Sequence, residues 1–259
     1  MRELASAWLK NNHAKSHLGL LLAAEDLFSA DGPAPFQFQQ QEVADGEWTR
    51  VRLKIVRQPP DDLSLIAGDV ASNMRAALDH AVFGLSKAKT RLNAFPIVAS
   101  KKVYFDEKRE KLLEGVDERF KEIVDRHQPF VGSSRRHPLA LLQWFNNTDK
   151  HKLTHPGFTR PRSLAISTTP PDRVSEVEVV TPSLSGPVLD GVELCRFRRT
   201  GQDKNFKVRT TVTFSIGFGD RAIDAIDLND IGVEIEGILG EFKRSEHKVG
   251  DGRGSTAGR

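Results

Sequence analysis

An apolar stripe with helical spacing runs through residues 63 to 87 and constrains the fold more than any other stretch. Pro59-Pro60 ends the extended segment before it, and Asp61, Asp62 and Ser64 offer side chains that can cap the start of a helix. The stripe recurs every three or four residues, which places it on one face of an α-helix. Its members are Ile66, Val70, Met74, Ala77, Ala81 and Leu85.

Four further segments show helical patterns bounded by helix-breaking residues. Asp31-Gly32-Pro33 ends the first, Gln128-Pro129 the second and Pro156-Gly157 the third. The fourth is an amphipathic segment close to the end of the chain. The helices expected from these patterns cover residues 3–29, 105–127, 138–153 and 228–244.

Alternating apolar and polar residues predict β-strands in two regions of the chain. The first region holds strands near 36–39 and 51–55, with Asp45-Gly46 as a hairpin turn. The second region holds strands at 164–168, 174–180, 192–197 and 208–216. Helices segregated from mostly antiparallel strands predict an α+β fold with an antiparallel helical core of four or five helices.

These elements suggest a division of the 259-residue chain. We expect residues 1–158 to form a helical core with an inserted β-hairpin at about 35–56. Residues 159–247 would be a β-rich segment and closing helix packed on the same domain. Residues 248–259 are rich in glycine and charge, which predicts a disordered tail.

Composition excludes some classes of function. The formal charge of +3 is too small to make attraction of the whole molecule to nucleic acid or membranes the first expectation. The apolar stretch Leu18 to Ala24 is too short to span a membrane and ends at Glu25-Asp26, so we expect neither export nor a membrane partner. A single cysteine, Cys195, favours the reducing cytoplasm.

Polar side chains beside the apolar stripe are the first candidates for chemistry. At about 100° per residue, Asp69, Asn73 and His80 fall along one margin of the buried face, whereas Arg75 and Asp79 fall on the far side with ion-pair spacing. A carboxylate beside a histidine can fix its tautomer for proton transfer. The same polar set also suits a structural hydrogen-bond network that fixes helix register.

A second polar run, Asn146 to His151, lies in the segment 138–153. Asn146 and Asp149 share its apolar face, while His151 points the other way. If the two helices pack face to face, Asn146 and Asp149 converge with the first set. A metal site could use His80, Asp149 and either Asp69 or His151, although no compact ligand motif is present, so we expect neither a metal nor a cofactor.

Two further features have a structural and a functional interpretation. Cys195 lies within a strand-like run, where a small buried apolar residue is the usual role, and so is a weak nucleophile candidate. Basic residues share one parity on several strands, which indicates either a solvated sheet face or a cationic platform for phosphates. They are Arg50, Arg52, Lys54, Arg196, Arg198, Lys207 and Arg209.

Residues 1–155 contain a series of short motifs in a fixed order. The motifs are Pro59-Pro60, Gly68-Asp69, Asn73-Met-Arg75, Ala77-Leu-Asp-His80, Phe95-Pro-Ile97, Gln128-Pro129, Pro138-Leu139 and Asn147-Thr-Asp-Lys-His151. In order and spacing they resemble a bacterial protein family that is common in actinobacteria and has no established function.

Arg75 and His80 are similar to the arginine and histidine signature of HEPN domains, many of which are metal-independent ribonucleases of toxin–antitoxin and phage-defence systems. The resemblance implies that Arg75 stabilises the charge of the scissile phosphate and that His80 moves a proton. It also implies an RNA partner and a homodimer.

The sequence leaves open whether the protein is an enzyme. The first interpretation is a cytoplasmic binding or interaction protein with a polar pocket around His80 and Asp149 for an unidentified small molecule. The alternatives are a HEPN-like ribonuclease that uses Arg75 and His80, and a metal-dependent hydrolase built from the aspartate and histidine set.

Overall fold

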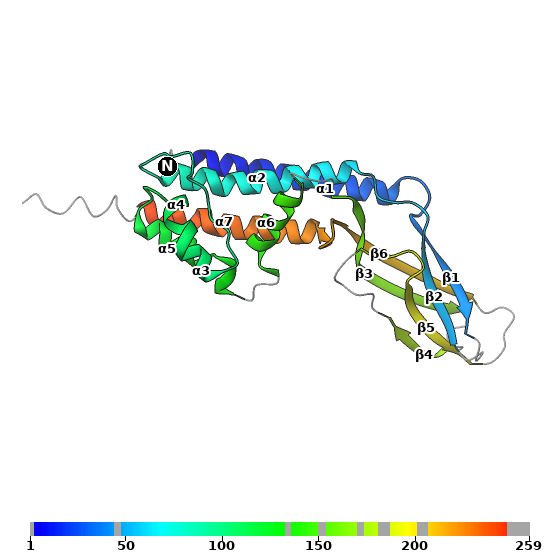
Figure 1. Cartoon of the computed structure of the whole chain (residues 1–259). Helices are drawn as coiled ribbons and strands as arrows, with labels where there is room; N and C mark the ends of the chain where they lie inside the picture. Colours follow the sequence, from blue (N-terminus) through cyan, green and yellow to red (C-terminus); the bar gives the residue numbers. More distant parts are fainter. Residues whose placement is uncertain are drawn as a thin grey trace, which may run out of the picture. The chain divides into compact units, whose positions relative to one another are not determined.

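The structure is a computed structural model that describes residues 3–43, 48–132, 136–149, 154–169, 174–180, 187–200 and 207–247. It confirms the expected α+β fold, with helices and antiparallel sheets (Figure 1). Contacts divide the chain into two compact units. The helical unit comprises 1–21, 65–153 and 226–259, and the sheet unit comprises 22–64 and 154–225.

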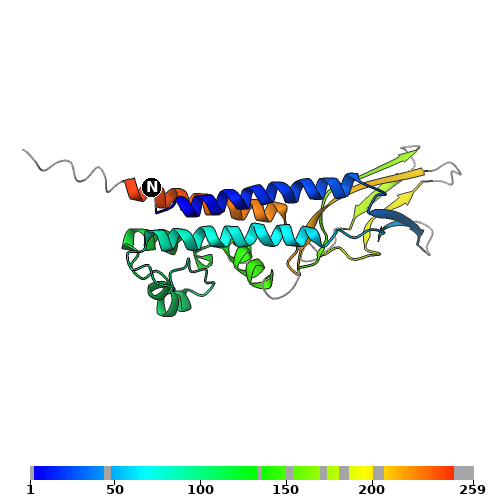
Figure 2. The ribbon, with the colours of Figure 1, turned by 90° about the horizontal axis from the view of Figure 1, so that it is seen from above.

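Three long helices contribute to the helical unit, and all three were expected from periodicity. They are α1 (Ala5–Ala30), α2 (Asp62–Leu85) and α7 (Ala225–His247), and α1 lies beside α2 in both views (Figures 1 and 2). The buried faces of α1 and α2 include alanines among larger apolar residues, whereas α7 contributes mainly larger side chains. Fully buried residues of these helices include Ala7, Ala14, Leu21, Val70, Met74, Ala77, Ala81, Ile231, Ile235, Ile238, Leu239 and Phe242.

The single charged helix expected over 105–127 is wrong. The structure has α3 (Lys101–Val103), a π-helical turn (Tyr104–Lys108), α4 (Arg109–Leu112) and, after a loop, α5 (Glu118–Arg126). Gly115 in the loop has a φ of +74°, and a Cβ there would lie 2.5 Å from Ala88 N. The loop docks on the end of α2, where Lys87 N donates to Gly115 O at 2.8 Å, so a continuous helix cannot form.

After a short 3₁₀ turn (Pro129–Val131), α6 (Pro138–Asp149) completes the helical unit. Its start at Pro138 agrees with the expectation, because proline suits the first turn of a helix. The expected end near Leu153 lies outside the described residues.

Two antiparallel sheets form the sheet unit, and the first of them combines strands from both β-regions of the sequence. The first has the order β1 (Phe36–Glu42), β2 (Trp48–Ile55), β5 (Glu193–Arg199) and β4 (Val174–Val179). The second has β3 (Pro156–Thr169), β6 (Lys207–Phe218) and β7 (Ile223–Asp224). The ring of Phe36 lies 5.3 Å from those of Phe158 and Phe214, which joins the two sheets in one aromatic core.

The expected hairpin turn and the tail from 248 lie outside the described residues, while the β1–β2 pairing itself is present. In the contact division this hairpin groups with the later strands, and α7 groups with the helices. The expected division near residue 158, with both parts packed in one domain, stays a prediction. Among the described residues, no helix is long and apolar enough to cross a membrane.

Candidate functional site

The three residues expected on one margin of α2 all face α1. As the residue numbers rise along α1 they fall along α2, so the two helices are antiparallel. We call this row of contacts the α1–α2 seam. Its pairs are Ser6 Oγ with His80 Nδ1 (2.7 Å), Lys10 Nζ with Asn73 Oδ1 (3.3 Å) and His17 Nδ1 with Asp69 Oδ2 (3.6 Å).

Asn146 and Asp149 lie on α6, where Asn146 is buried and Asp149 approaches Gly68 and Asp69 of α2. Its carboxylate contacts the α2 backbone at Gly68, where an added Cβ would lie 2.7 Å from Oδ2. Burial and the neighbouring charge of Asp69 raise the pKa of Asp149. His80 is twelve residues beyond Gly68 on α2, about 18 Å away at 1.5 Å per residue, so the structure does not bring His80 to Asp149.

Arg75 and His80 contact different neighbours. Arg75 forms a two-bond ion pair with Asp79, and its guanidinium also donates to Gln143 Oε1 on α6 at 3.2 Å. His80 instead contacts Ser6 on α1. The two side chains expected to act together in a ribonuclease therefore share no partner, and that function stays a prediction. His151 lies outside the described residues.

The remaining candidates from the sequence are a metal site, Cys195 and the basic residues of the strands. Within the described ranges, no group of three or more histidine, cysteine, aspartate or glutamate side chains could hold a metal ion. Burial raises the pKa of Cys195 to about 11, so its thiol is protonated at neutral pH. Arg50 lies opposite Arg196 in the β2–β5 register, and each is paired with a glutamate, Arg50 with Glu193 and Arg196 with Glu178.

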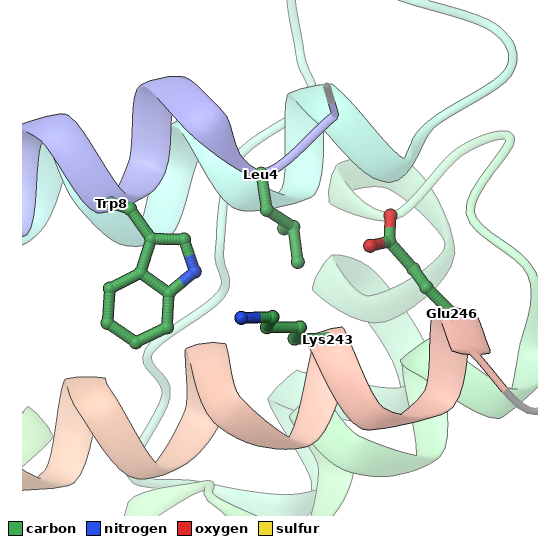
Figure 3. Close-up of a pocket in the computed structure, with 4 residues that line it drawn as sticks. All are labelled: Leu4, Trp8, Lys243 and Glu246. Carbon is green, nitrogen blue, oxygen red and sulfur yellow. The ribbon is translucent and has the colours of Figure 1, made fainter. Parts of the chain in front are cut away.

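A small pocket lies between α1 and α7 in the helical unit. Leu4, just before α1, and Trp8 of α1 reach toward it from one side, and Lys243 and Glu246 reach toward it from α7 (Figure 3). Its volume is about 100 Å³. Leu4 is buried, Trp8 is half-buried, and Lys243 is exposed, so the apolar wall lies deeper than the ammonium group.

Contacts outside the pocket hold both of its walls. On the other side of the same turn of α1, Ser6 contacts His80 of α2. Near the end of α7, Arg119 of α5 donates to Ser245 O at 3.0 Å. Of the two helices that form the pocket, α1 is therefore anchored to α2, and α7 is anchored to α5.

Sequence reasoning did not identify this pocket. Leu4 and Trp8 fall within the helix expected over residues 3–29, and nothing local indicates that Lys243 and Glu246 face them. It also missed the pair His13 and His17 on α1, whose i,i+4 spacing was a visible signal.

Comparison with known proteins yields no relative. No protein-family model matches the chain, and the searches of curated proteins and of solved structures found no match. The resemblances to the actinobacterial family and to HEPN domains stay predictions from the sequence.

Proposed function

We propose that this protein is a binding protein that holds a small ligand in the pocket between α1 and α7. The observation that carries the proposal is the composition of the pocket, which combines an apolar wall of Leu4 and Trp8 with one cation, Lys243, and one anion, Glu246. Ligand sites commonly pair an apolar lining with a few polar groups that fix orientation.

The size of the pocket limits the ligand. A water molecule needs roughly 10–15 Å³ of cavity volume. The pocket volume of about 100 Å³ therefore accommodates only a few non-hydrogen atoms of a ligand, and the rest of the ligand projects into solvent. Nucleotides and peptides are much larger than this. A single small metabolite fits the space best.

The charges indicate which small metabolite is favoured. Lys243 can bind a carboxylate and Glu246 an ammonium group, while the indole of Trp8 and the side chain of Leu4 contact an apolar substituent. An α-amino acid with an aliphatic side chain carries all three groups. We therefore assign free aliphatic amino acids as the ligand class.

Binding is favoured over catalysis because the residues best suited to acid–base chemistry lie elsewhere in the helical unit. His80 faces Ser6 and Arg75 faces Asp79, both on α2 and away from the pocket lining. The cytoplasm is the compartment we favour, since the buried free thiol of Cys195 is compatible with a reducing environment.

Calorimetric titration of the full chain with L-leucine tests the proposal. We expect saturable binding that is lost in Trp8→Ala and weakened in Lys243→Gln, while Lys54→Gln, which changes an exposed lysine of β2, binds as the wild type does. N-acetyl-L-leucine amide keeps the side chain but lacks both charges, so it should bind poorly. Equal binding of the two compounds, or no binding of any free aliphatic amino acid, contradicts the proposal.

A further inference from the structure

Two histidines of α1 point their Nε2 atoms at each other on the surface of the helical unit. His13 is exposed and His17 is half-buried, and their Nε2 atoms lie 3.1 Å apart. The rings meet at an interplanar angle of 68° with their centroids 4.4 Å apart. Histidines at positions i and i+4 of a helix are the pair used by helical zinc motifs, because both rings reach the same point.

The separation of the two nitrogens suits a shared metal ion. Zinc–imidazole bonds are about 2.0–2.1 Å long, so two cis ligands lie about 2.9 Å apart at a right angle and about 3.3 Å apart at the tetrahedral angle. The observed 3.1 Å falls between these limits. The separation of the two nitrogens therefore matches that of two imidazole ligands of one first-row ion.

Asp69 of α2 favours the histidine tautomer that this requires. Its Oδ2 atom lies 3.6 Å from His17 Nδ1, on the opposite side of the ring from the Nε2 atom that faces His13. A carboxylate at this position holds the proton on Nδ1 and leaves the lone pair on Nε2, as in the carboxylate–histidine–zinc arrangement. His17 therefore directs a lone pair at His13.

The nearest lysines do not oppose a cation there. Lys10 donates to Asn73 at 3.3 Å, and Lys15 forms an ion pair with Glu236 of α7. Both ammonium groups are thus engaged by other side chains. A proton shared between His13 and His17 can occupy the space between the rings, and a metal ion would replace that proton.

We infer that His13 and His17 form a two-histidine site for a divalent transition metal ion, with Asp69 as the carboxylate that orients His17. Imidazole ligands suit Zn²⁺, Ni²⁺ and Cu²⁺, whereas Mg²⁺ and Ca²⁺ require oxygen ligands. No third histidine, cysteine, aspartate or glutamate joins the pair among the described residues. Water completes the coordination, so the site is open and exchangeable.

Calorimetric titration of the full chain, with any affinity tag removed, tests the site. We expect one NiCl₂ or ZnCl₂ equivalent to bind and MgCl₂ not to compete. His13→Gln and His17→Gln should each abolish binding at this site, and Asp69→Asn should weaken it about 10- to 100-fold. His155→Gln is the matched control, because His155 also contacts an aspartate, Asp61, at 3.2 Å.

Thermal unfolding supplies a second measurement. An ion that binds only the folded chain raises the unfolding temperature, and the rise should vanish in the double variant His13→Gln/His17→Gln. His13 is exposed, so its replacement removes no core contact, and circular dichroism checks that each variant folds. The inference is overturned if the double variant binds Ni²⁺ and Zn²⁺ as tightly as the wild type, or if binding is lost in His155→Gln instead.

Discussion

Arg75 and Asp79, one turn apart on α2, hold the same residue of the following loop by its backbone. Arg75 Nη2 donates to Phe95 O at 2.6 Å, and Asp79 Oδ1 accepts a hydrogen bond from Phe95 N at 2.9 Å. The two side chains also pair with each other through two bonds. Arg75, one of the two residues that resemble a HEPN signature, therefore helps Asp79 to attach the loop after α2 to the helix.

Replacing Arg75 should lower stability, because it removes the guanidinium that donates to Asp79 and to the carbonyl of Phe95. Loss of a buried hydrogen-bond partner costs about 1–3 kcal/mol, and we expect Arg75→Leu to reduce the free energy of unfolding by that amount. Urea denaturation measures the change. In a double-mutant cycle, Arg75→Leu and Asp79→Leu should be strongly non-additive. Additive effects would show that the two residues do not act as one unit.

His127 should make stability depend on pH through two glutamates of α7. Its Nδ1 lies 2.7 Å from Glu234 and its Nε2 3.1 Å from Glu241. The hydrogen bond to Glu234, aided by Glu241, raises the pKa of His127 against the opposing effect of burial, and the bond from His127 lowers the pKa of Glu234. Burial opposes a lower pKa of Glu241, but hydrogen bonds from Arg126 and His127 outweigh it.

The sign of each shift sets the pH window. The contribution of His127 is complete below its ordinary pKa of 6.5 and is lost as the pH rises through the raised value. The contribution of the glutamates is complete above 4.5 and is lost as the pH falls through their lowered values. The difference in unfolding temperature between the wild type and His127→Gln should be largest between pH 4.5 and 6.5. A difference that is constant from pH 4 to pH 9 would be inconsistent with this network.

Glu25 of α1, in the sheet unit, should destabilise the protein when it ionises. Its Oε1 makes no hydrogen bond with the described residues, and Arg162 lies 3.9 Å from Oε2. Burial raises the pKa of Glu25 from 4.5 to about 7, against the opposing charge of Arg162. Because the folded pKa is higher than the unfolded one, stability falls as the pH rises from 4.5 to 7.

Glu25→Gln keeps the shape of the side chain and removes the charge. We expect this variant to be more stable than the wild type at pH 8, by up to about 3 kcal/mol, and to lose that advantage at pH 4. Chemical denaturation at both pH values makes the comparison. A loss of stability at pH 8 would show that the carboxylate has a stabilising role.

Gly84 allows the first turn of α1 to approach α2. A Cβ at this position would lie 2.0 Å from Glu3 O, a backbone atom that must then move. Gly84→Ala should therefore be destabilising, although alanine has the higher helix propensity by about 1 kcal/mol. Gly19→Ala is the control, because nothing lies within 4 Å of its Cβ, and it should be stabilising. The prediction fails if both variants are stabilised in thermal unfolding.

The sequence was sufficient to predict those elements whose structure depends on local contacts. The stripe from Val70 to Ala81 and the capping residues before it placed α2, and the same helical projection put Asp69, Asn73 and His80 on one margin. A projection identifies a face but not the helix that covers it. The helix that covers this margin is α1, which contacts it through Ser6, Lys10 and His17. The sequence of α2 alone could not predict this partner.

Long-range contacts account for what the sequence did not reveal. The break after α4 depends on the fit of Gly115 against Ala88, and the pairing of β2 with β5 joins strands that are far apart in the chain. The pocket has the same origin, since Trp8 and Lys243 meet only when α7 packs on α1. The local periodicity of the sequence does not predict these long-range contacts.

The indole proton spectrum of the full chain tests the proposed ligand pocket most directly. The chain has three tryptophans, Trp8, Trp48 and Trp144, and Trp8→Phe assigns the signal of the pocket. Addition of L-leucine should shift the Trp8 indole resonance in a saturable manner and leave those of Trp48 and Trp144 in place. A Trp8 resonance that does not move with L-leucine or any other aliphatic amino acid, or a saturable shift of Trp48 or Trp144 alone, would contradict the account.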